Sequence, residues 1–143
     1  WGGNWDYSIP PRQRDFAHGL IDRAAVDVVH GHSSHHVKGI EVYNERPILY
    51  GCGDLLSDYE GIAGHEEFRG ELGLMYFLSL EAATGRLQRF EMTPTRLRKL
   101  RINRALREEA RWLVDVLNRE GRPLGTRAIL GEDLRLVLQW SSA

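Results

Sequence analysis

Apolar residues recur at helical spacing in two segments of the chain, and each segment predicts an amphipathic helix. The first follows a proline pair at residues 10–11, which a first helical turn tolerates, and runs for about 14 residues to Ala24. The second spans Ala105–Arg119 and is expected to end at Gly121. Each helix therefore presents one apolar face that must pack against another element.

Alternating or β-branched apolar runs elsewhere in the chain predict strands. Val26–Val29, bounded by turn-forming residues, is typical of a short buried strand directly after the first helix. Residues 97–102 indicate a further strand, in which a break in the alternation predicts a β-bulge. Three hairpins complete the pattern: Ile40–Tyr43 with Pro47–Tyr50, Leu72–Leu80 with Arg86–Met92, and 126–130 with 134–140. This order of elements predicts an α/β fold with a substantial antiparallel part.

The composition is that of an ordinary soluble globular protein. The 143 residues are 42% hydrophobic and 27% charged, which suits one domain or a large piece of one. A formal net charge of −1 gives no global reason to expect nucleic acid or an acidic membrane surface as partner. No apolar run approaches the roughly 20 residues that span a bilayer. Cys52 is the only cysteine, so no intrachain disulfide can form, which favours a reducing compartment.

Four of the six histidines fall within seven residues: His30, His32, His35 and His36. Imidazole is the commonest metal ligand, and this turn follows a buried strand, where ligands bind in open α/β sheets. We expect His32 and His35 to converge on one metal ion, His30 to be buried at the strand end, and His36 to face solvent. The alternative is a polar loop that is histidine-rich by composition alone.

Further candidates lie near the same edge of the predicted sheet. Asp54 follows the first hairpin, where it would bind a metal or orient an imidazole, with ordinary turn chemistry as the slightly favoured alternative. Cys52 is expected to be a small buried hydrophobe rather than a nucleophile. The aromatic residues Trp1, Trp5 and Tyr7 would either line a substrate pocket or pack the N-terminal loop onto the domain.

One marked basic block lies within residues 96–111, which hold seven lysines and arginines. It could hold a polyanion electrostatically. Acidic residues follow it, and no interleaved aromatic residues suggest base stacking. A solvated strand edge and helix face is the favoured interpretation.

Residues 10–58 together resemble a known family. Ser34, His36 and Asp54 depart from its pattern, standing where the family has proline, an apolar residue and commonly asparagine. The segments that carry the resemblance are Leu20-Ile21-Asp22, Val26-Asp27-Val28-Val29, Gly31-His32-Ser33-Ser34-His35, Gly39-Ile40-Glu41-Val42-Tyr43, Ile48-Leu49-Tyr50 and Gly53-Asp54. They are similar to the C-terminal half of the CapA family. This family takes part in capsule and poly-γ-glutamate synthesis and is related to the calcineurin-like metallophosphoesterases.

The resemblance implies a fold and a set of site residues. The chain would be part of a two-sheet α/β/β/α sandwich with mixed and antiparallel strands, with the site motifs in residues 1–58 and hairpins plus a helix in 71–143. It also implies divalent metal ions (Mn, Zn, Fe or Mg) and two-metal hydrolysis of a phosphoester. The implied metal ligands are His32, His35 and Asp54, the two histidines being catalytic, and the implied contacts to substrate or ligands are Trp1, Asn4, His36 and Asp58.

By resemblance, the metal-bridging aspartate and an Asn-His motif belong to an N-terminal half that lies outside these 143 residues. We therefore expect the chain alone to be inactive and to associate with that half or with a second copy. Three functions stay open. The first is a metal-dependent phosphoesterase-like hydrolase, and the second is a non-catalytic capsule-synthesis component that binds an anionic polymer or a partner protein. The third is a domain in which a structural metal ion only holds a loop in place.

Overall fold

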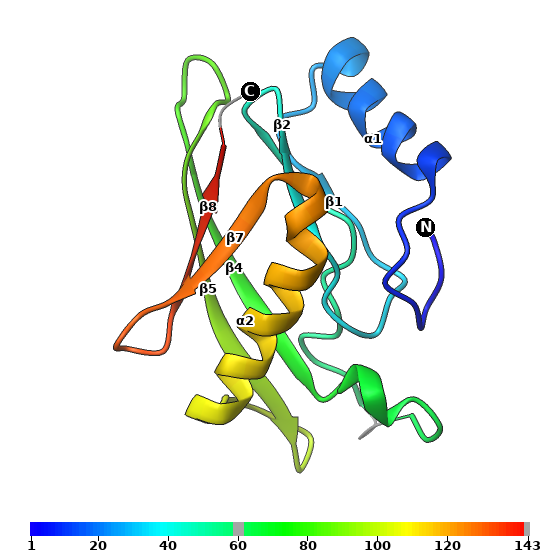
Figure 1. The fold of residues 1–143 in the computed structure, drawn as a ribbon, viewed down its shortest axis with the longest axis vertical. Coiled ribbons are helices and arrows are strands. Elements are labelled where there is room, and N and C mark those ends of the chain that lie inside the picture. The colour runs from blue at the N-terminus through cyan, green and yellow to red at the C-terminus, as the bar shows by residue number, and fades with distance from the viewer. Residues whose placement is uncertain (59–61, 142–143) are drawn as a thin grey trace.

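Two β-sheets and two long helices form the part of the chain that the structure, a computed structural model, describes, namely residues 1–58 and 62–141 (Figure 1). The predicted fold class, α/β with mixed and antiparallel strands, is confirmed. The elements are, in order, α1 (Pro11–Ala24), β1 (Val29–His30), β2 (Ile40–Tyr43), β3 (Arg46–Leu49), the 3-10 helix η1 (Glu66–Phe68), β4 (Leu72–Leu80), β5 (Leu87–Arg98), β6 (Arg101–Arg104), α2 (Arg107–Gly121), the 3-10 helix η2 (Arg122–Leu124), β7 (Thr126–Leu130) and β8 (Leu136–Trp140).

The smaller sheet is mixed and has the strand order β1-β3-β2. β1 runs parallel to β3, with Val29 opposite Ile48, and β2 pairs antiparallel with β3. The residues that connect β2 to β3, Asn44 and Glu45, have φ angles of 46° and 62°, as in the type I′ turns that suit the twist of a hairpin. Because β1 and β3 are parallel, the chain leaves both strands at the same edge of the sheet.

The larger sheet is antiparallel, with the order β4-β5-β8-β7 and with β6 paired to the end of β5. One face packs against α2, which lies across the sheet in Figure 1. Leu74, Phe90 and Leu136 of the sheet and Leu113 and Leu117 of the helix are each at most 3% exposed. Burial of each such side chain contributes roughly 1.5–3 kcal/mol, so this layer is the main core.

A second apolar cluster lies under α1. Ala17 and Ile21 of the helix pack with Ile48 and Tyr50, which are 0% and 1% exposed. The small sheet also contributes to the main core, through Ile40. The smaller sheet is thus held between α1 and the main core.

The first helix and the three hairpins are confirmed as α1, β2–β3, β4–β5 and β7–β8. The strand expected at Val26–Val29 is wrong in extent, since only Val29–His30 pair with β3. Upstream of them, Asp27 Oδ1 accepts a hydrogen bond from Arg46 Nε at 3.1 Å, which holds this part of the segment as a loop.

The bulge expected within residues 97–102 is a hairpin turn instead. Lys99 and Leu100 reverse the chain between β5 and β6, with φ angles of 53° and 55°. A break in apolar alternation has the same appearance in a sequence whether the strand bulges or reverses. The irregularity in strand pairing lies elsewhere, between Ser79 and Leu80.

The second helix begins two residues later than expected, at Arg107, and reaches Gly121. Its start is fixed by Glu109, whose Oε2 accepts a hydrogen bond from the backbone N–H of Leu106 at 2.7 Å. No helix in the described part of the chain is long and apolar enough to cross a membrane.

Candidate functional site

The histidine-rich turn lies at the edge where β1 and β3 both end. The Gly31 N–H donates to the Leu49 carbonyl at 2.8 Å, and the Cys52 N–H donates to the Gly31 carbonyl at 3.2 Å. Gly31 leaves no room for a side chain, because a Cβ there would lie 2.3 Å from Trp1 Nε1 and 2.6 Å from Leu49 O. This packing places the histidine turn against the residues that follow β3.

His35 and Asp54 meet at this edge. His35 Nδ1 donates to Asp54 Oδ2 at 2.8 Å, and the two side chains are 23% and 26% exposed. A carboxylate that accepts Nδ1–H fixes the tautomer and the ring plane, so that Nε2 is the acceptor atom of the neutral ring. Asp54 therefore contacts the imidazole as an orienting carboxylate would, although its place after Gly53 slightly favoured a turn role.

The Trp5 indole packs against the same imidazole. It stacks on His35 with ring centroids 5.0 Å apart and on His65 with centroids 4.5 Å apart. Gly70 allows this close approach, since a Cβ there would lie 3.1 Å from Trp5 Cη2 and 3.2 Å from His35 O. Sequence reasoning missed His65, because it lies in a polar stretch that has no periodicity.

The N-terminal segment packs on the histidine turn. The Asn4 carbonyl accepts a hydrogen bond from the His35 N–H at 3.2 Å, and Asn4 Oδ1 accepts one from Ser33 Oγ at 3.1 Å. Trp1 Nε1 donates to the Tyr50 carbonyl at 3.1 Å, and its ring stacks on the Tyr50 ring. Trp1 thus fastens this loop to the domain, and substrate contact by Trp1 and Asn4 stays a prediction.

The described residues alone do not form a complete metal site. His32 is exposed, and its carbonyl accepts a hydrogen bond from the Trp1 nitrogen at 3.3 Å. Within residues 1–58 and 62–141, no three His, Cys, Asp or Glu side chains group closely enough to hold a metal ion. Zinc sites in proteins use three or four such donors. The His35–Asp54 pair therefore does not by itself complete a zinc site, zinc being one of the divalent metals that the family resemblance implies.

His30 and His36 have the opposite environments to those expected. His30 is exposed, whereas His36 is 1% exposed and its ring centroid lies 4.6 Å from that of Tyr7 and 4.6 Å from that of Phe68. His36 Nδ1 donates to the Val37 carbonyl at 3.1 Å, while Nε2 is buried with no hydrogen-bond partner among the described residues. Burial lowers the pKa of His36. The expectation that His36 faces solvent is wrong, because the side chain fills the apolar position that the resemblance assigns to it.

Asp58 and Cys52 lie on either side of Asp54 in the sequence, in different environments. Asp58 is exposed next to residues 59–61, which are outside the described residues, so its contact to substrate stays a prediction. Cys52 is 8% exposed, and burial raises the pKa of its thiol to about 12. A thiol that stays protonated at neutral pH is a poor nucleophile, which supports the structural interpretation of Cys52.

Glu41 is a buried charge that sequence reasoning did not select as a site residue. Its carboxylate, on a side chain 5% exposed, accepts hydrogen bonds from Arg14 Nη2 at 2.6 Å, Tyr50 Oη at 2.6 Å and His18 Nε2 at 3.1 Å. Burial opposes ionisation, and the hydrogen bonds from Arg14, Tyr50 and His18 outweigh it, so the pKa of Glu41 is lowered. Beforehand, Glu41 was marked only by its place in the segment Gly39–Tyr43 that resembles the family, and the contacts show that it joins α1 to the small sheet.

Lys38 is a second buried charge, behind the histidine turn. It is 2% exposed, and its Nζ donates to the Ser8 carbonyl at 2.6 Å. Gly51 makes room for it, since a Cβ there would lie 2.7 Å from Lys38 Cγ. Burial lowers the pKa of Lys38, against the charges of Asp6 and Glu120. A single lysine between valine and glycine gives no pattern that would mark it in the sequence.

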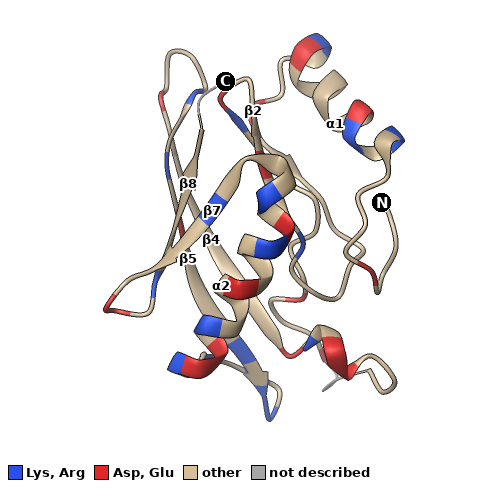
Figure 2. Cartoon of the chain, viewed as in Figure 1, with Lys and Arg blue, Asp and Glu red and all other residues tan. Residues whose placement is uncertain are grey.

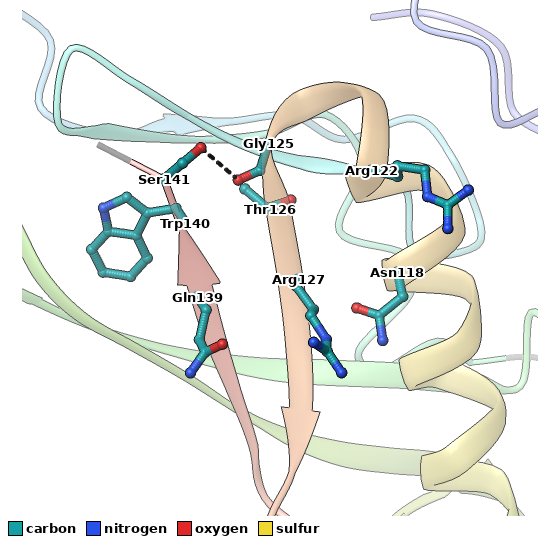
Figure 3. A pocket seen from close by; sticks show the side chains of 8 residues that line it. All are labelled: Asn118, Arg122, Gly125, Thr126, Arg127, Gln139, Trp140 and Ser141. Carbon is teal, nitrogen blue, oxygen red and sulfur yellow. Dashed lines mark hydrogen bonds between the residues drawn. The ribbon is translucent and has the colours of Figure 1, made fainter. Parts of the chain in front are cut away.

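A shallow depression of about 700 Å³ lies away from the histidine turn, where α2, η2, β7 and β8 meet (Figure 3). Arg122 and Arg127 line it, both exposed and neither in a salt bridge with any described residue. Asn118 also lines it and closes the outer edge of β7, donating to the Ala128 carbonyl at 3.1 Å and accepting from its N–H at 2.7 Å. Two guanidinium groups with nearby amides suit an anionic ligand.

The histidine turn and its carboxylate lie in a segment that matches a known protein family. Residues 1–59, which include the histidine turn, Glu41 and Asp54, match the family model described as bacterial capsule synthesis protein PGA_cap. The chain is 47% identical over 133 residues to the probable polyglutamine synthesis accessory protein of Mycobacterium tuberculosis, which covers 93% of this chain and 35% of that relative. It is 35% identical over 94 residues to the PGA biosynthesis protein CapA of Bacillus subtilis, which covers 66% of this chain and 22% of that relative. The chain thus spans about a third or less of the length of these relatives.

Proposed function

This chain belongs to the bacterial capsule synthesis family PGA_cap, and on that premise we propose that it is part of an accessory protein of capsule or poly-glutamate synthesis. Two kinds of similarity support this. The family model covers the histidine turn and Asp54, and the two relatives carry names that refer to polyglutamine synthesis and PGA biosynthesis.

We further infer that the chain contributes the His35–Asp54 side of a metal-dependent, phosphoester-type hydrolytic site. The observation that carries this is the 2.8 Å hydrogen bond between the two side chains, at the edge where the parallel strands β1 and β3 end. Ligands of α/β sheets bind beyond this end of the strands. His32 would be a further ligand, and the remaining donors would come from outside the described residues.

The described residues account for a positioned imidazole. Asp54 holds the Nδ1–H of His35, and the Trp5 ring restricts its plane. An imidazole held in this way can accept or release a proton at Nε2 or offer that lone pair to a cation. A divalent ion, when bound, would supply an activated water and charge neutralisation for a phosphoryl group.

The test is hydrolysis of a chromogenic phosphodiester by the protein at its natural length, with Mn²⁺ or Zn²⁺ added after chelation. We expect metal-dependent turnover that His35→Gln lowers by at least about 100-fold and Asp54→Asn by about 10- to 100-fold. His30→Gln is the matched control, because His30 is an exposed histidine of the same segment. Absence of metal-dependent turnover, or equal activity in His35→Gln, would contradict the proposal.

A second candidate function is non-catalytic binding of an anionic polymer. The observation that favours it is the depression lined by Arg122 and Arg127, whose guanidinium groups form no salt bridge with the residues that the structure describes. Titration calorimetry with poly-glutamate tests it, and Arg122→Ala with Arg127→Ala should weaken binding by about 10-fold or more. Equal binding by this variant would exclude the depression as the polymer site.

A further inference from the structure

The hairpin β5–β6 carries a turn that its own sequence does not favour. Lys99 and Leu100 are its two turn residues, and both have positive φ angles, 53° and 55°. Such two-residue turns prefer Asn-Gly, because a side chain is strained in the left-handed region. Long side chains at both positions point to a use for the tip that outweighs this strain.

The positions of two arginines in this hairpin are also unfavourable for the stability of the sheet. Arg98 and Arg101 are directly opposite each other across the two strands, so both lie on the same face. Like charges in such a pair destabilise a sheet. Neither arginine, nor Lys99 or Arg104, forms a salt bridge with any described residue. Figure 2 shows lysine and arginine colouring (blue) on the hairpin turn at the lower end of the molecule.

Apolar side chains also lie on the other face of the hairpin and at its tip. Leu97 and Ile102 are opposite each other across the strands, on the face away from Arg98 and Arg101. Leu100 is 57% exposed and Ile102 is 39% exposed. A soluble polyanion would contact only the cations, whereas a lipid surface also takes up apolar side chains below its headgroups.

The hairpin is braced so that it can present this tip. Asn103 Nδ2 donates to the Arg101 carbonyl at 2.9 Å and also approaches the Arg96 and Arg98 carbonyls. At its base, Arg96 Nη1 pairs with the buried Glu109 at 2.9 Å, which joins β5 to α2. The tip is therefore held on the main core.

We propose that the β5–β6 tip (Arg98, Lys99, Leu100, Arg101 and Ile102) docks the protein on a membrane that contains anionic phospholipid. The cations contact the headgroups, and Leu100 and Ile102 enter the region below them. The formal net charge of −1 does not reveal this surface, because it averages the local cluster with acidic residues elsewhere.

The test is co-sedimentation of the 143-residue chain with vesicles of phosphatidylcholine, with or without phosphatidylglycerol. We expect binding only to the anionic vesicles, reduced by raising the salt well above about 0.1 M. Arg98→Glu with Arg101→Glu should lower the affinity by at least about 10-fold. Arg12→Glu with Arg23→Glu is the control, since it makes the same charge change at exposed arginines of α1 and should leave binding within about twofold.

A second variant separates docking from folding. Lys99→Asn with Leu100→Gly supplies the residues that the turn prefers, so the melting temperature should stay equal or rise while vesicle binding falls. No binding to anionic vesicles, or an equal loss in the α1 control, would overturn the proposal. So would binding to soluble poly-glutamate at this tip without binding to vesicles, which would make it a polymer site.

Discussion

The Tyr50 hydroxyl donates a 2.6 Å hydrogen bond to Glu41 Oε2, and this contact is the innermost part of a network that joins α1 to the small sheet. Arg14 and His18 reach the same carboxylate from the helix. Tyr50 lies one residue after β3 and is 1% exposed, so its hydroxyl has no access to bulk water in place of Glu41. The network fixes the helix over the strands whose ends carry the histidine turn.

Replacing Tyr50 with phenylalanine should therefore lower the free energy of unfolding. We expect a loss of about 2 kcal/mol, because a hydrogen bond to a buried charged group is removed. Urea denaturation measures it. Tyr43→Phe is the control, since the Tyr43 hydroxyl bonds to Asp22 at the surface and its loss should cost less than about 0.5 kcal/mol. Equal losses of unfolding free energy in both variants would show that the hydrogen bond to Glu41 stabilises the fold no more than the surface hydrogen bond of Tyr43 does.

His36 should make the stability of the protein fall in mild acid. Its pKa is lowered from the ordinary value of 6.5 by burial, with Lys38 acting in the same direction and with the Val37 carbonyl and Asp6 opposing. Above pH 6.5 the ring is neutral in both states, so the stability contribution is fully present. As the pH falls below that value, the unfolded chain binds a proton that the folded one does not, at a cost of up to about 1.4 kcal/mol per pH unit.

The measurement is the free energy of unfolding from pH 8 to 5 for the wild type and for His36→Leu. The variant should show a shallower decline below about pH 6.5, since it lacks the titrating ring. His30→Gln, at an exposed position, should follow the wild-type curve. Parallel curves for wild type and His36→Leu would mean that other groups cause the acid sensitivity.

The outer face of the larger sheet should make this chain self-associate. Phe77, Val137 and Ile129 lie in one row across the strands, joined through Glu91, and are 50%, 37% and 39% exposed. Exposed apolar residues that lie together mark interaction surfaces. Association by edge pairing at β7 is hindered, because the Asn118 side chain occupies the Ala128 backbone groups.

Sedimentation velocity over a range of concentrations should show dimers or larger species that Phe77→Lys shifts toward monomer by about 10-fold in the dissociation constant. Leu56→Lys is the control, because Leu56 is 64% exposed on a loop remote in the sequence from the sheet. A wild-type chain that stays monomeric at high concentration would contradict this expectation.

Much of the fold could be predicted because its signals are local. Apolar residues at helical spacing behind a proline determined α1, and alternating runs around turn residues determined the three hairpins. The signal at 97–102 was misread, since a reversal at Lys99–Leu100 without glycine has no turn signature.

The site could be predicted only in part. Two strand ends at one edge were enough to expect Asp54 near the histidine turn, and the structure joins it to His35. Trp5 and His65, which stack beside the pair, come from segments with no shared pattern. Their meeting depends on how the N-terminal loop packs, which no spacing along the chain encodes.

The histidine turn is the clearest case in which the sequence determined which residues are present and the tertiary structure decided their environments. The sequence by itself determined that several imidazoles follow β1 and that residues 1–59 carry a capsule-synthesis motif. Only the tertiary structure decided that His35 pairs with a carboxylate, that His36 is buried and that His30 is exposed. The reason is that adjacent side chains of a turning backbone point in different directions, so their environments are set by elements packed around them from distant parts of the chain.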